Sequence, residues 1–365
     1  MRFYCDKQSI TQAVSAVSKA TVAKSTLKAI EGVLMKLNGN NLLLTGFNLE
    51  IGIRTNIQVK GDEDGEIVLN ARLLGEILRK MPDGDIMLSS NDRFLTEING
   101  SEVLYTIIGT DPSEFPELPE LYDYESIKIS HPILKSLINQ TVFAASTDEN
   151  RPVLNGAKFD INEGLLTVSA LDGYRLAIRK QKIEADSNYS FVVPSKTLGE
   201  ISRLLSDDSE LEAVISIGKK HIIFKINDYT VISRLLEGDF LDYSSSLSKE
   251  ATTQVKISTR AFINSLDRTS LLINENTITP VRCNFADDKL NISCITALGK
   301  IYDSIPVKIS GTPLEIGFNN KYLTDALKAS ETDEVLLKIS GPLSPMKIVP
   351  LEGEDFLFLV LPMRL

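Results

Sequence analysis

The feature that most constrains this chain is one segment that occurs three times along it. The segment occupies residues 68–78, 192–202 and 316–327, and its copies begin 124 residues apart. In every copy a short apolar run leads into a stretch typical of a helix, where a leucine follows a Lys or Arg: Leu74, Leu198 and Leu323. Three copies of one module, each with a cation on a helix, suggest a protein that repeats around an anionic partner.

The repeat predicts three domains. A length of 365 residues divides into three modules of about 120 residues, a common domain size, and 43% apolar residues are enough to give each module a core. Two similar linker sequences, 114–118 and 239–243, lie between the modules. We place the domains at residues 1–124 (N-terminal), 125–250 (central) and 251–365 (C-terminal).

Hydrophobic spacing predicts two helices and several strands in every module. In the first module a helical stripe of apolar side chains runs through Ile10, Ala13, Val14 and Val17. Equivalent patterns predict six helices, at 5–20, 70–80, 131–145, 195–206, 258–272 and 319–329. Alternating runs predict antiparallel strands, with hairpins that turn at Asn99-Gly100 and Asn227-Asp228. The expected fold class is α+β, with two helices on one face of antiparallel sheets in each of three repeated modules.

Charge is distributed unevenly over these elements. The chain has a net charge of −10, which argues against a nucleic-acid partner when taken alone. Counted on Lys, Arg, Asp and Glu, however, the six predicted helices carry +7, so the rest of the chain carries −17. The sequence therefore predicts a basic helical surface within an otherwise acidic protein.

The side chains that most enzymes use are scarce. Only His131 and His221 occur, and both fit a capping or surface position better than a general base. No nucleotide-binding glycine motif, zinc motif or nucleophile elbow is present, and three cysteines without a CxxC pair predict buried structural thiols. The acidic run 61–65 lacks the ligand spacing of a calcium loop and is expected to be a solvated turn. We expect no metal and no cofactor.

Membrane insertion and secretion are also not expected. The first residues lack the apolar stretch of a secretory signal, and no apolar run approaches the roughly 18 residues needed to span a bilayer. The expected location is cytoplasmic, at the nucleoid.

With catalysis, metal binding and membrane insertion not expected, the remaining signal is a set of cations that could bind a partner. Cations lie on or beside all six predicted helices: Lys7, Lys19, Lys24, Arg72, Arg79, Lys80, Lys135, Lys196, Arg203, Arg260, Arg268, Lys321 and Lys328. Each of them alone is explained by solvation of a helix face, but the sign difference between helices and strands favours phosphate contact. Aromatic platforms for single strands and an isolated recognition helix are missing, so the sequence favours contact with phosphate groups that is independent of base sequence.

At this point the chain resembles the bacterial DNA polymerase III β subunit, the family of sliding clamps. The resemblance covers the whole chain, and its most specific segments are 42–50, 153–156, 171–176 and the C-terminal 361–365. It implies a non-enzymatic processivity factor whose protomers join head to tail into a homodimeric ring, with helices inside and sheets outside. A heterologous interface that closes by rotation gives such a ring. The dimer-interface positions that it implies are Tyr105, Ile107, Leu271 and Leu272, for which core packing is the alternative.

The resemblance also implies two binding surfaces. The positions facing DNA are Lys24, Arg72, Arg151, Pro152, Val153 and Lys196. Asp148 departs from the family pattern, which has a neutral amide at this position. Its negative charge is expected to repel phosphate.

The second surface is a groove that binds a short peptide with a glutamine and apolar anchors. Its implied positions are Val153, Leu154, Leu171, Gly173, Tyr174, Arg175, Leu176, Leu241, Asn319, Tyr322, Leu343, Pro345, Met346, Val360, Leu361, Pro362, Met363 and Arg364. Leu241, Ser245 and Ser246 depart from the family pattern in the second linker.

The implied partners are duplex DNA, a second copy of the chain, the replicative polymerase, the clamp loader, and other polymerases and repair proteins. Two other readings stay open. One is a hydrolase or transferase that uses Asp172, Tyr174 and Arg175, and the other is a three-domain scaffold without a nucleic-acid ligand.

Overall fold

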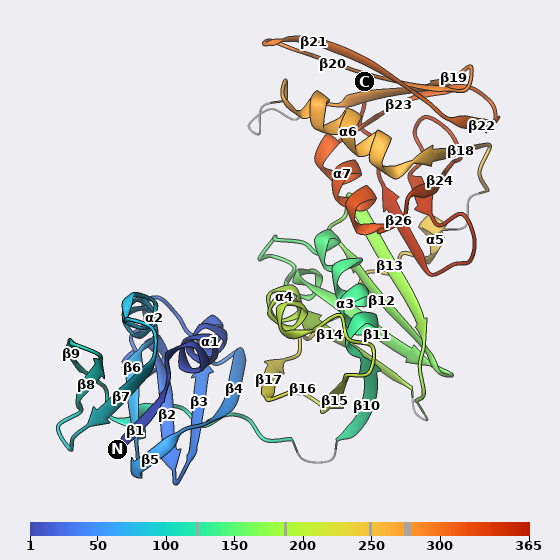
Figure 1. The fold of residues 1–365 in the computed structure, drawn as a ribbon. Coiled ribbons are helices and arrows are strands. Elements are labelled where there is room, and N and C mark those ends of the chain that lie inside the picture. Colours follow the sequence, from blue (N-terminus) through green and yellow to red (C-terminus); the bar gives the residue numbers. More distant parts are fainter. Residues whose placement is uncertain (122–123, 186–187, 248–249, 274–278) are drawn as a thin grey trace. The chain divides into compact units, whose positions relative to one another are not determined.

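The fold repeats one order of elements three times (Figure 1). A computed structural model describes residues 1–121, 124–185, 188–247, 250–273 and 279–365 of the chain. The N-terminal module contains β1 (Arg2–Asp6), α1 (Lys7–Val17), β2 (Gly32–Asn38), β3 (Asn41–Phe47), β4 (Ile51–Gln58), β5 (Lys60–Glu63), β6 (Gly65–Asn70), α2 (Ala71–Lys80), β7 (Asp85–Ser90), β8 (Leu95–Gly100) and β9 (Val103–Ile108).

The same order returns twice: strand, helix, strands, helix, strands. The central module contains β10 (Glu125–Ser130), α3 (His131–Asn139), β11 (Gly156–Asn162), β12 (Leu165–Leu171), β13 (Arg175–Lys182), β14 (Tyr189–Pro194), α4 (Ser195–Leu204), β15 (Glu212–Ile217), β16 (His221–Ile226) and β17 (Tyr229–Arg234). The C-terminal module contains β18 (Thr253–Ser258), α6 (Thr259–Ser270), β19 (Val281–Ala286), β20 (Lys289–Thr296), β21 (Gly299–Pro306), β22 (Lys308–Gly311), β23 (Leu314–Phe318), α7 (Asn320–Ala329), β24 (Glu334–Ile339), β25 (Met346–Val349) and β26 (Phe356–Val360). The predicted α+β modules and the six predicted helices are confirmed.

The helices begin where a polar side chain caps them. Asn70 accepts a hydrogen bond from Leu73 N at the start of α2, and Asn319 accepts one from Lys321 N at the start of α7. Asp6 caps α1 through Ser9 N. A capping residue lies outside the helix that it starts, so α1, α2 and α7 begin one or two residues later than predicted. Helices α3 and α4 begin where predicted and end earlier, at Asn139 and Leu204.

The sheets are antiparallel, and two of them join strands of successive modules. One sheet has the order β10-β15-β16-β17-β4-β3-β2-β6, so that β17 of the central module pairs with β4. Another has the order β14-β11-β12-β13-β26-β25-β24-β18-β22, so that β13 pairs with β26. The two smaller sheets are β5-β1-β7-β8-β9 and β21-β20-β19-β23.

The chain divides into two compact units. One contains residues 1–132 with 203–235, and the other contains 133–202 with 236–365. The central module contributes to both units because its two groups of strands belong to different sheets. The predicted boundaries at 124 and 250 are untested by this division and stay predictions.

The predicted helical stripe forms the core of the N-terminal module. All four of its side chains, Ile10, Ala13, Val14 and Val17, are buried, and α1 packs on β3 and β4. The helix α2 lies beside α1 and against β2 and β6 (Figure 1). Both helices therefore cover the same sheet with their apolar sides, and their polar sides do not contribute to this core.

Two details of the N-terminal module differ from prediction. The hairpin β8–β9 turns at Ser101-Glu102, while Asn99 and Gly100 lie inside β8. Gly100 packs closely there, because a Cβ atom on it would lie 2.7 Å from the terminal methyl group of Met81, which would have to shift. The acidic run 61–65 is not a simple turn, because Lys60–Glu63 forms β5. The second predicted turn, Asn227-Asp228, is confirmed.

A short helix in the second linker was missed. The segment Ser244–Leu247 forms α5, although the sequence predicts only a connector there. Asp242 begins it by accepting hydrogen bonds from the backbone and hydroxyl groups of Ser244.

The cysteines occupy strands, as expected. Cys5, Cys283 and Cys294 are free and buried, and burial raises the pKa of the Cys283 thiol to about 12. Among the described residues no group of three or more His, Cys, Asp and Glu side chains is placed to hold a metal. None of the described helices is both long and apolar enough to cross a lipid bilayer.

His131 opens α3 as expected but is buried, so the expected surface position is wrong. Its Nδ1 atom accepts a hydrogen bond from Ser206 N at 3.4 Å, and its Nε2 atom has no partner among the described residues. Burial lowers the pKa of His131, and nearby Asp208 opposes this shift only in part. The folded protein therefore favours the neutral ring.

We expect this histidine to make stability depend on pH. The unfolded chain binds a proton near pH 6.5, whereas the folded chain binds it only at lower pH, so stability is full above pH 6.5 and falls as the pH drops below it. In urea unfolding of the full chain between pH 7.5 and 5.5, His131→Gln should flatten this decline. A decline as steep in the variant as in the unaltered chain would contradict the assignment. His221, whose pKa is lowered by burial and by the charges of Arg234 and Lys220, should give a residual slope of its own.

Candidate nucleic-acid interface and peptide-binding surface

The cations are sorted by element in the structure as they are in the sequence. With the observed bounds, helices α1, α2, α3, α4, α6 and α7 again carry a net charge of +7. The predicted DNA-facing cations Lys24, Arg72, Arg151 and Lys196 are all exposed. They are thus available to a ligand rather than used in a core.

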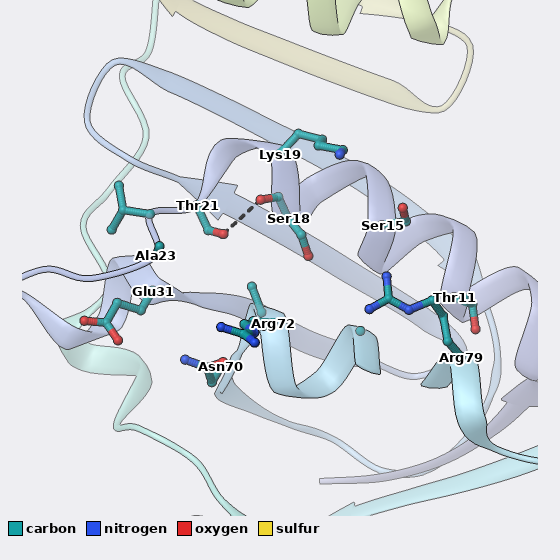
Figure 2. A pocket seen from close by; sticks show the side chains of 13 residues that line it. Thr11, Ser15, Ser18, Lys19, Thr21, Ala23, Glu31, Asn70, Arg72 and Arg79 are labelled. Carbon is teal, nitrogen blue, oxygen red and sulfur yellow. Dashed lines mark hydrogen bonds between the residues drawn. The ribbon is translucent and has the colours of Figure 1, made fainter. Parts of the chain in front are cut away.

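A polar cavity lies between α1 and α2 in the N-terminal module (Figure 2). It measures about 440 Å³, and three cations line it: Lys19 just after α1, and Arg72 and Arg79 on α2. Hydroxyl groups of Thr11, Ser15, Ser18 and Thr21 and the amide of Asn70 complete its polar lining. The hydroxyl groups of Thr11, Ser18 and Thr21 donate to backbone carbonyls of the same segment, so the three cations are the groups that suit the oxygen atoms of phosphate.

Charge pairing at the cavity is partial. The Arg72 side chain is 87% exposed and lies 3.0 Å from Glu76, and this hydrogen bond lowers the pKa of the Glu76 carboxyl. Glu31 is the acidic residue of the lining, and it pairs with Lys28 at 2.9 Å. Lys24 is not part of the lining and lies in the loop between Ala20 and Lys28. Hydrogen bonds from Ser25 N and Lys28 lower the pKa of Glu31, and the charge of Lys24 adds to them. Lys19 and Arg79 were singled out only as helix cations by the sequence, not as DNA-facing positions.

In the second unit, Arg151, Pro152 and Val153 surround the start of a 3-10 turn, Pro152–Asn155. Asp148 holds the preceding turn, since its carboxylate accepts hydrogen bonds from Asn150 N at 3.0 Å and from Asn150 Nδ2 at 2.7 Å. These bonds, and then the charge of Arg151, lower the pKa of Asp148. The Asp148 carboxylate therefore stabilises a turn, and this is a structural role next to the exposed Arg151. Lys196 lies apart from this turn, in the first turn of α4.

An apolar surface cluster forms where β12, β13 and β26 meet. Its buried members are Leu154, Leu171, Leu176, Ile178 and Leu359, and the partly buried side chains packed on them are Val153, Phe240, Tyr243, Leu247, Leu357 and Leu361. Five predicted groove residues belong to this cluster: Val153, Leu154, Leu171, Leu176 and Leu361. Partly buried apolar side chains over a firm apolar base suit the anchors of a short peptide.

Other predicted groove residues lie elsewhere. Met346 and Val360 pair across β25 and β26 and are completely buried, so they support the sheet from within. Leu241 and Leu343 are 51% and 82% exposed, and neither belongs to the cluster. Sequence reasoning missed Ile178, Leu357, Leu359, Phe240, Tyr243 and Leu247. The continuous apolar run 356–360 is the signal that could have indicated two of them, Leu357 and Leu359.

Arg175 organises the polar side of this surface. Its Nε atom lies 3.0 Å from Asp172, and its Nη1 atom lies 2.6 Å from Asp325 on α7. Its guanidinium carbon lies 4.5 Å from the ring centre of Tyr322 and 5.6 Å from that of Phe143. The arginine therefore links the β12–β13 hairpin to α7 through charge and cation–π contacts.

The turn between β12 and β13 depends on Asp172 and Gly173. The Asp172 carboxylate accepts hydrogen bonds from Tyr174 N and Arg175 N, and Gly173 adopts a φ of +91° that other residues avoid. Tyr174 is left 63% exposed, and its ring stacks on Tyr322 with 6.2 Å between the ring centres.

The C-terminal tail is held by its main chain. Leu361 N donates to Tyr174 O at 2.9 Å, and Met363 N donates to Gly317 O at 2.8 Å. These two bonds fix the main chain on both sides of Pro362. The side chain of Met363 is half-buried, and that of Leu365 is 50% exposed. Asn319, also predicted for the groove, caps the nearby helix α7.

Two of the predicted dimer positions lie on an edge strand, and the other two follow helix α6. β9 ends one sheet and β21 ends another. On β9 the predicted Tyr105 and Ile107 are half-buried, whereas Ile108 is 77% exposed. Leu271, after α6, is 81% exposed, and Leu272 is half-buried. An edge strand with exposed apolar side chains is a natural place for pairing with another chain.

Comparison with known proteins gives one consistent result. Residues 1–119, 128–242 and 245–364 match the N-terminal, central and C-terminal domains of the DNA polymerase III beta subunit family. The chain is 33% identical over 381 residues to the beta sliding clamp of Halalkalibacterium halodurans and 32% identical over 377 residues to that of Bacillus subtilis, in both cases with 100% of each chain covered. The crystal structure of the Bacillus subtilis sliding clamp superposes with a TM-score of 0.93 at 32% identity, covering 100% of this chain and 99% of that one.

We expect Arg175 to be a strong determinant of stability. Arg175→Met leaves the carboxylates of Asp172 and Asp325 without their shared cation, which should lower the free energy of unfolding by about 2 to 3 kcal/mol. Lys321→Met is the matched control, because it removes a more exposed cation 3.4 Å from the same Asp325 and should cost less than about 1 kcal/mol. Equal losses in urea unfolding of the two variants would contradict the central position of Arg175.

Proposed function

The chain belongs to the DNA polymerase III beta subunit family, and from that membership we propose that it is a sliding clamp that encircles duplex DNA and keeps the replicative polymerase on its template. The family consists of accessory polymerase subunits, so the chain is a processivity factor and not an enzyme. The observation that carries the proposal is the threefold module whose helices hold a net charge of +7 in a chain of −10. We expect it to act in the cytoplasm, at the nucleoid.

A clamp needs retention without tight binding. Strong contacts would hold the protein at one register of the duplex, whereas a closed ring stays on DNA without them. Two copies joined head to tail supply such a ring. The edge strands β9 and β21, with Ile108 and Leu271 exposed near them, support this mode of pairing. Of the other positions proposed for the dimer interface, Tyr105 and Ile107 lie on β9 and Leu272 follows α6.

Weak contacts with the phosphate backbone then suffice. Lys24, Arg72, Arg151 and Lys196 are exposed, and Arg72 lines the polar cavity together with Lys19 and Arg79. Such contacts carry no base sequence information, which suits a protein that must pass over every sequence.

The second part of the proposal is a docking site for short peptides of the polymerase, the clamp loader and other partners. The apolar surface cluster supplies a place for apolar anchors, and the hairpin around Gly173, the Arg175 contacts and the C-terminal tail border it. Aromatic rings of Tyr174 and Tyr322 add contact area with little conformational freedom to lose.

Hydrolase or transferase chemistry at the same hairpin is not favoured. Asp172 accepts hydrogen bonds from two backbone N–H groups and from Arg175, so its carboxylate is engaged in structure. An activated nucleophile requires a base within hydrogen-bond reach. Neither histidine supplies one here, because His131 bonds Ser206 and His221 opens β16.

The DNA contacts predict a specific salt dependence. The double change Lys24→Ala with Arg72→Ala should lower affinity for a linear duplex and reduce the slope of log K against log salt by about 2. On nicked circular DNA, loaded protein should be retained and should be released when the circle is cut. The control is Lys36→Ala with Lys60→Ala, which removes two exposed strand cations of the same module and should change neither slope nor retention. An unchanged slope in the first variant would overturn the assignment of Lys24 and Arg72.

Docking should separate from DNA retention. Met363→Ala with Leu365→Ala should weaken binding of a labelled peptide that contains one glutamine and apolar anchors by at least about tenfold, while retention on circular DNA stays unchanged. The tail should keep its place because its main-chain bond to Gly317 remains. Loss of both activities together would contradict two separate surfaces, and full peptide affinity would exclude the tail from the docking site.

A further inference from the structure

The connector between the central and C-terminal modules forms part of the apolar surface cluster. Phe240, Tyr243 and Leu247 belong to this connector and pack on the buried leucines of the cluster. The two strands below it, β13 and β26, belong to a nine-stranded sheet and are fixed by ladder hydrogen bonds on both sides. Residues 240–247 of the connector, the part next to the cluster that the structure describes, join no strand ladder, so their position depends on side-chain contacts.

At its amino end the short helix α5 is fixed by Asp242. The Asp242 carboxylate accepts a hydrogen bond from Ser244 N at 2.9 Å and another from the Ser244 hydroxyl at 2.7 Å. These two bonds lower the pKa of Asp242. A helix of one turn is too short to be stable on its own, so its carboxyl end needs a partner as well.

Lys347 supplies that partner. It lies on β25, and its ammonium group donates a hydrogen bond of 2.7 Å to the carbonyl oxygen of Leu247, the last residue of α5. A cation that bonds the free carbonyls at the end of a helix is stabilising. The contact spans 100 residues of sequence and joins the connector directly to the sheet.

The surroundings of Lys347 disfavour the charged form of its side chain. The side chain is half-buried, and its neighbours across the strands are Lys338 on β24 and Leu359 on β26. Burial first, and the charge of Lys338 second, lower the pKa of Lys347. Leu359 is itself a member of the apolar surface cluster. A half-buried cation between an apolar side chain and a like charge is stabilised by the carbonyl group of Leu247.

We propose that Lys347 is a positioning residue of the peptide-binding surface, which holds α5 so that Phe240, Tyr243 and Leu247 form one side of it. The inference rests on the docking function proposed above and goes beyond it, because Lys347 does not belong to the apolar cluster and acts through α5. The ligand it serves is an apolar peptide segment whose anchors pack against the connector.

Three variants of the full-length chain test the proposal. Lys347→Met keeps the length of the side chain but removes the donor, Lys347→Arg keeps a charged donor, and Lys338→Met is the control on the neighbouring strand. The first readout is affinity for a fluorescein-labelled synthetic peptide of one glutamine followed by leucine and phenylalanine residues. The second is hydrogen exchange of the backbone amides in 240–247, measured without peptide.

Lys347→Met should weaken peptide binding about fivefold, the loss expected when one hydrogen bond is removed, and should speed exchange in 240–247. Lys347→Arg should recover most of the affinity and protection, and Lys338→Met should change neither. Unaltered affinity and exchange in Lys347→Met would overturn the proposal, as would an equal effect of Lys338→Met, which would indicate a general loss of sheet stability. If the unaltered chain fails to bind the peptide, the docking function is overturned, and the exchange rates still decide whether Lys347 holds α5.

Discussion

Antiparallel pairing between strands of successive modules is the constraint on which the rest of this structure depends. β17 pairs with β4, and β13 pairs with β26, so each of these sheets includes strands from two modules. Buried backbone groups must form hydrogen bonds, and a shared sheet satisfies them at a module boundary where a flexible linker could not. One consequence is functional: the pairing of β13 with β26 brings Leu176 and Leu359 into one apolar cluster, although they lie far apart in the sequence.

The two proposed surfaces make opposite physical demands. Contact with DNA requires exposed charge that binds weakly, and the helices supply it with cations such as Arg72, which is 87% exposed and only partly neutralised by Glu76. Docking requires apolar area and fixed geometry, and the sheets supply both, with Arg175 bonded to Asp172 and Asp325. An acidic total charge is compatible with a DNA partner because the cations are concentrated on helices and the anions elsewhere.

The sequence predicted most of what depends on local pattern. The stripe through Ile10 and Val17 located a buried helix face, and the threefold repeat gave the module and its fold class. The sequence could not predict features that depend on contacts between residues far apart in the chain. Gly100 was read as a turn residue because its packing against Met81 is a tertiary contact, and α5 was missed because one turn has no periodicity. The bond from Lys347 to Leu247 joins residues 100 apart, and no spacing rule indicates it.

The central claim is that two copies of the chain close into one ring, since a single copy cannot encircle a duplex. Native mass spectrometry of the full-length chain at low micromolar concentration tests it most directly. Because one chain has a mass of 40.3 kDa, the account predicts a dominant species at twice that mass. A species of 40.3 kDa alone, unchanged as the concentration is raised, would contradict it.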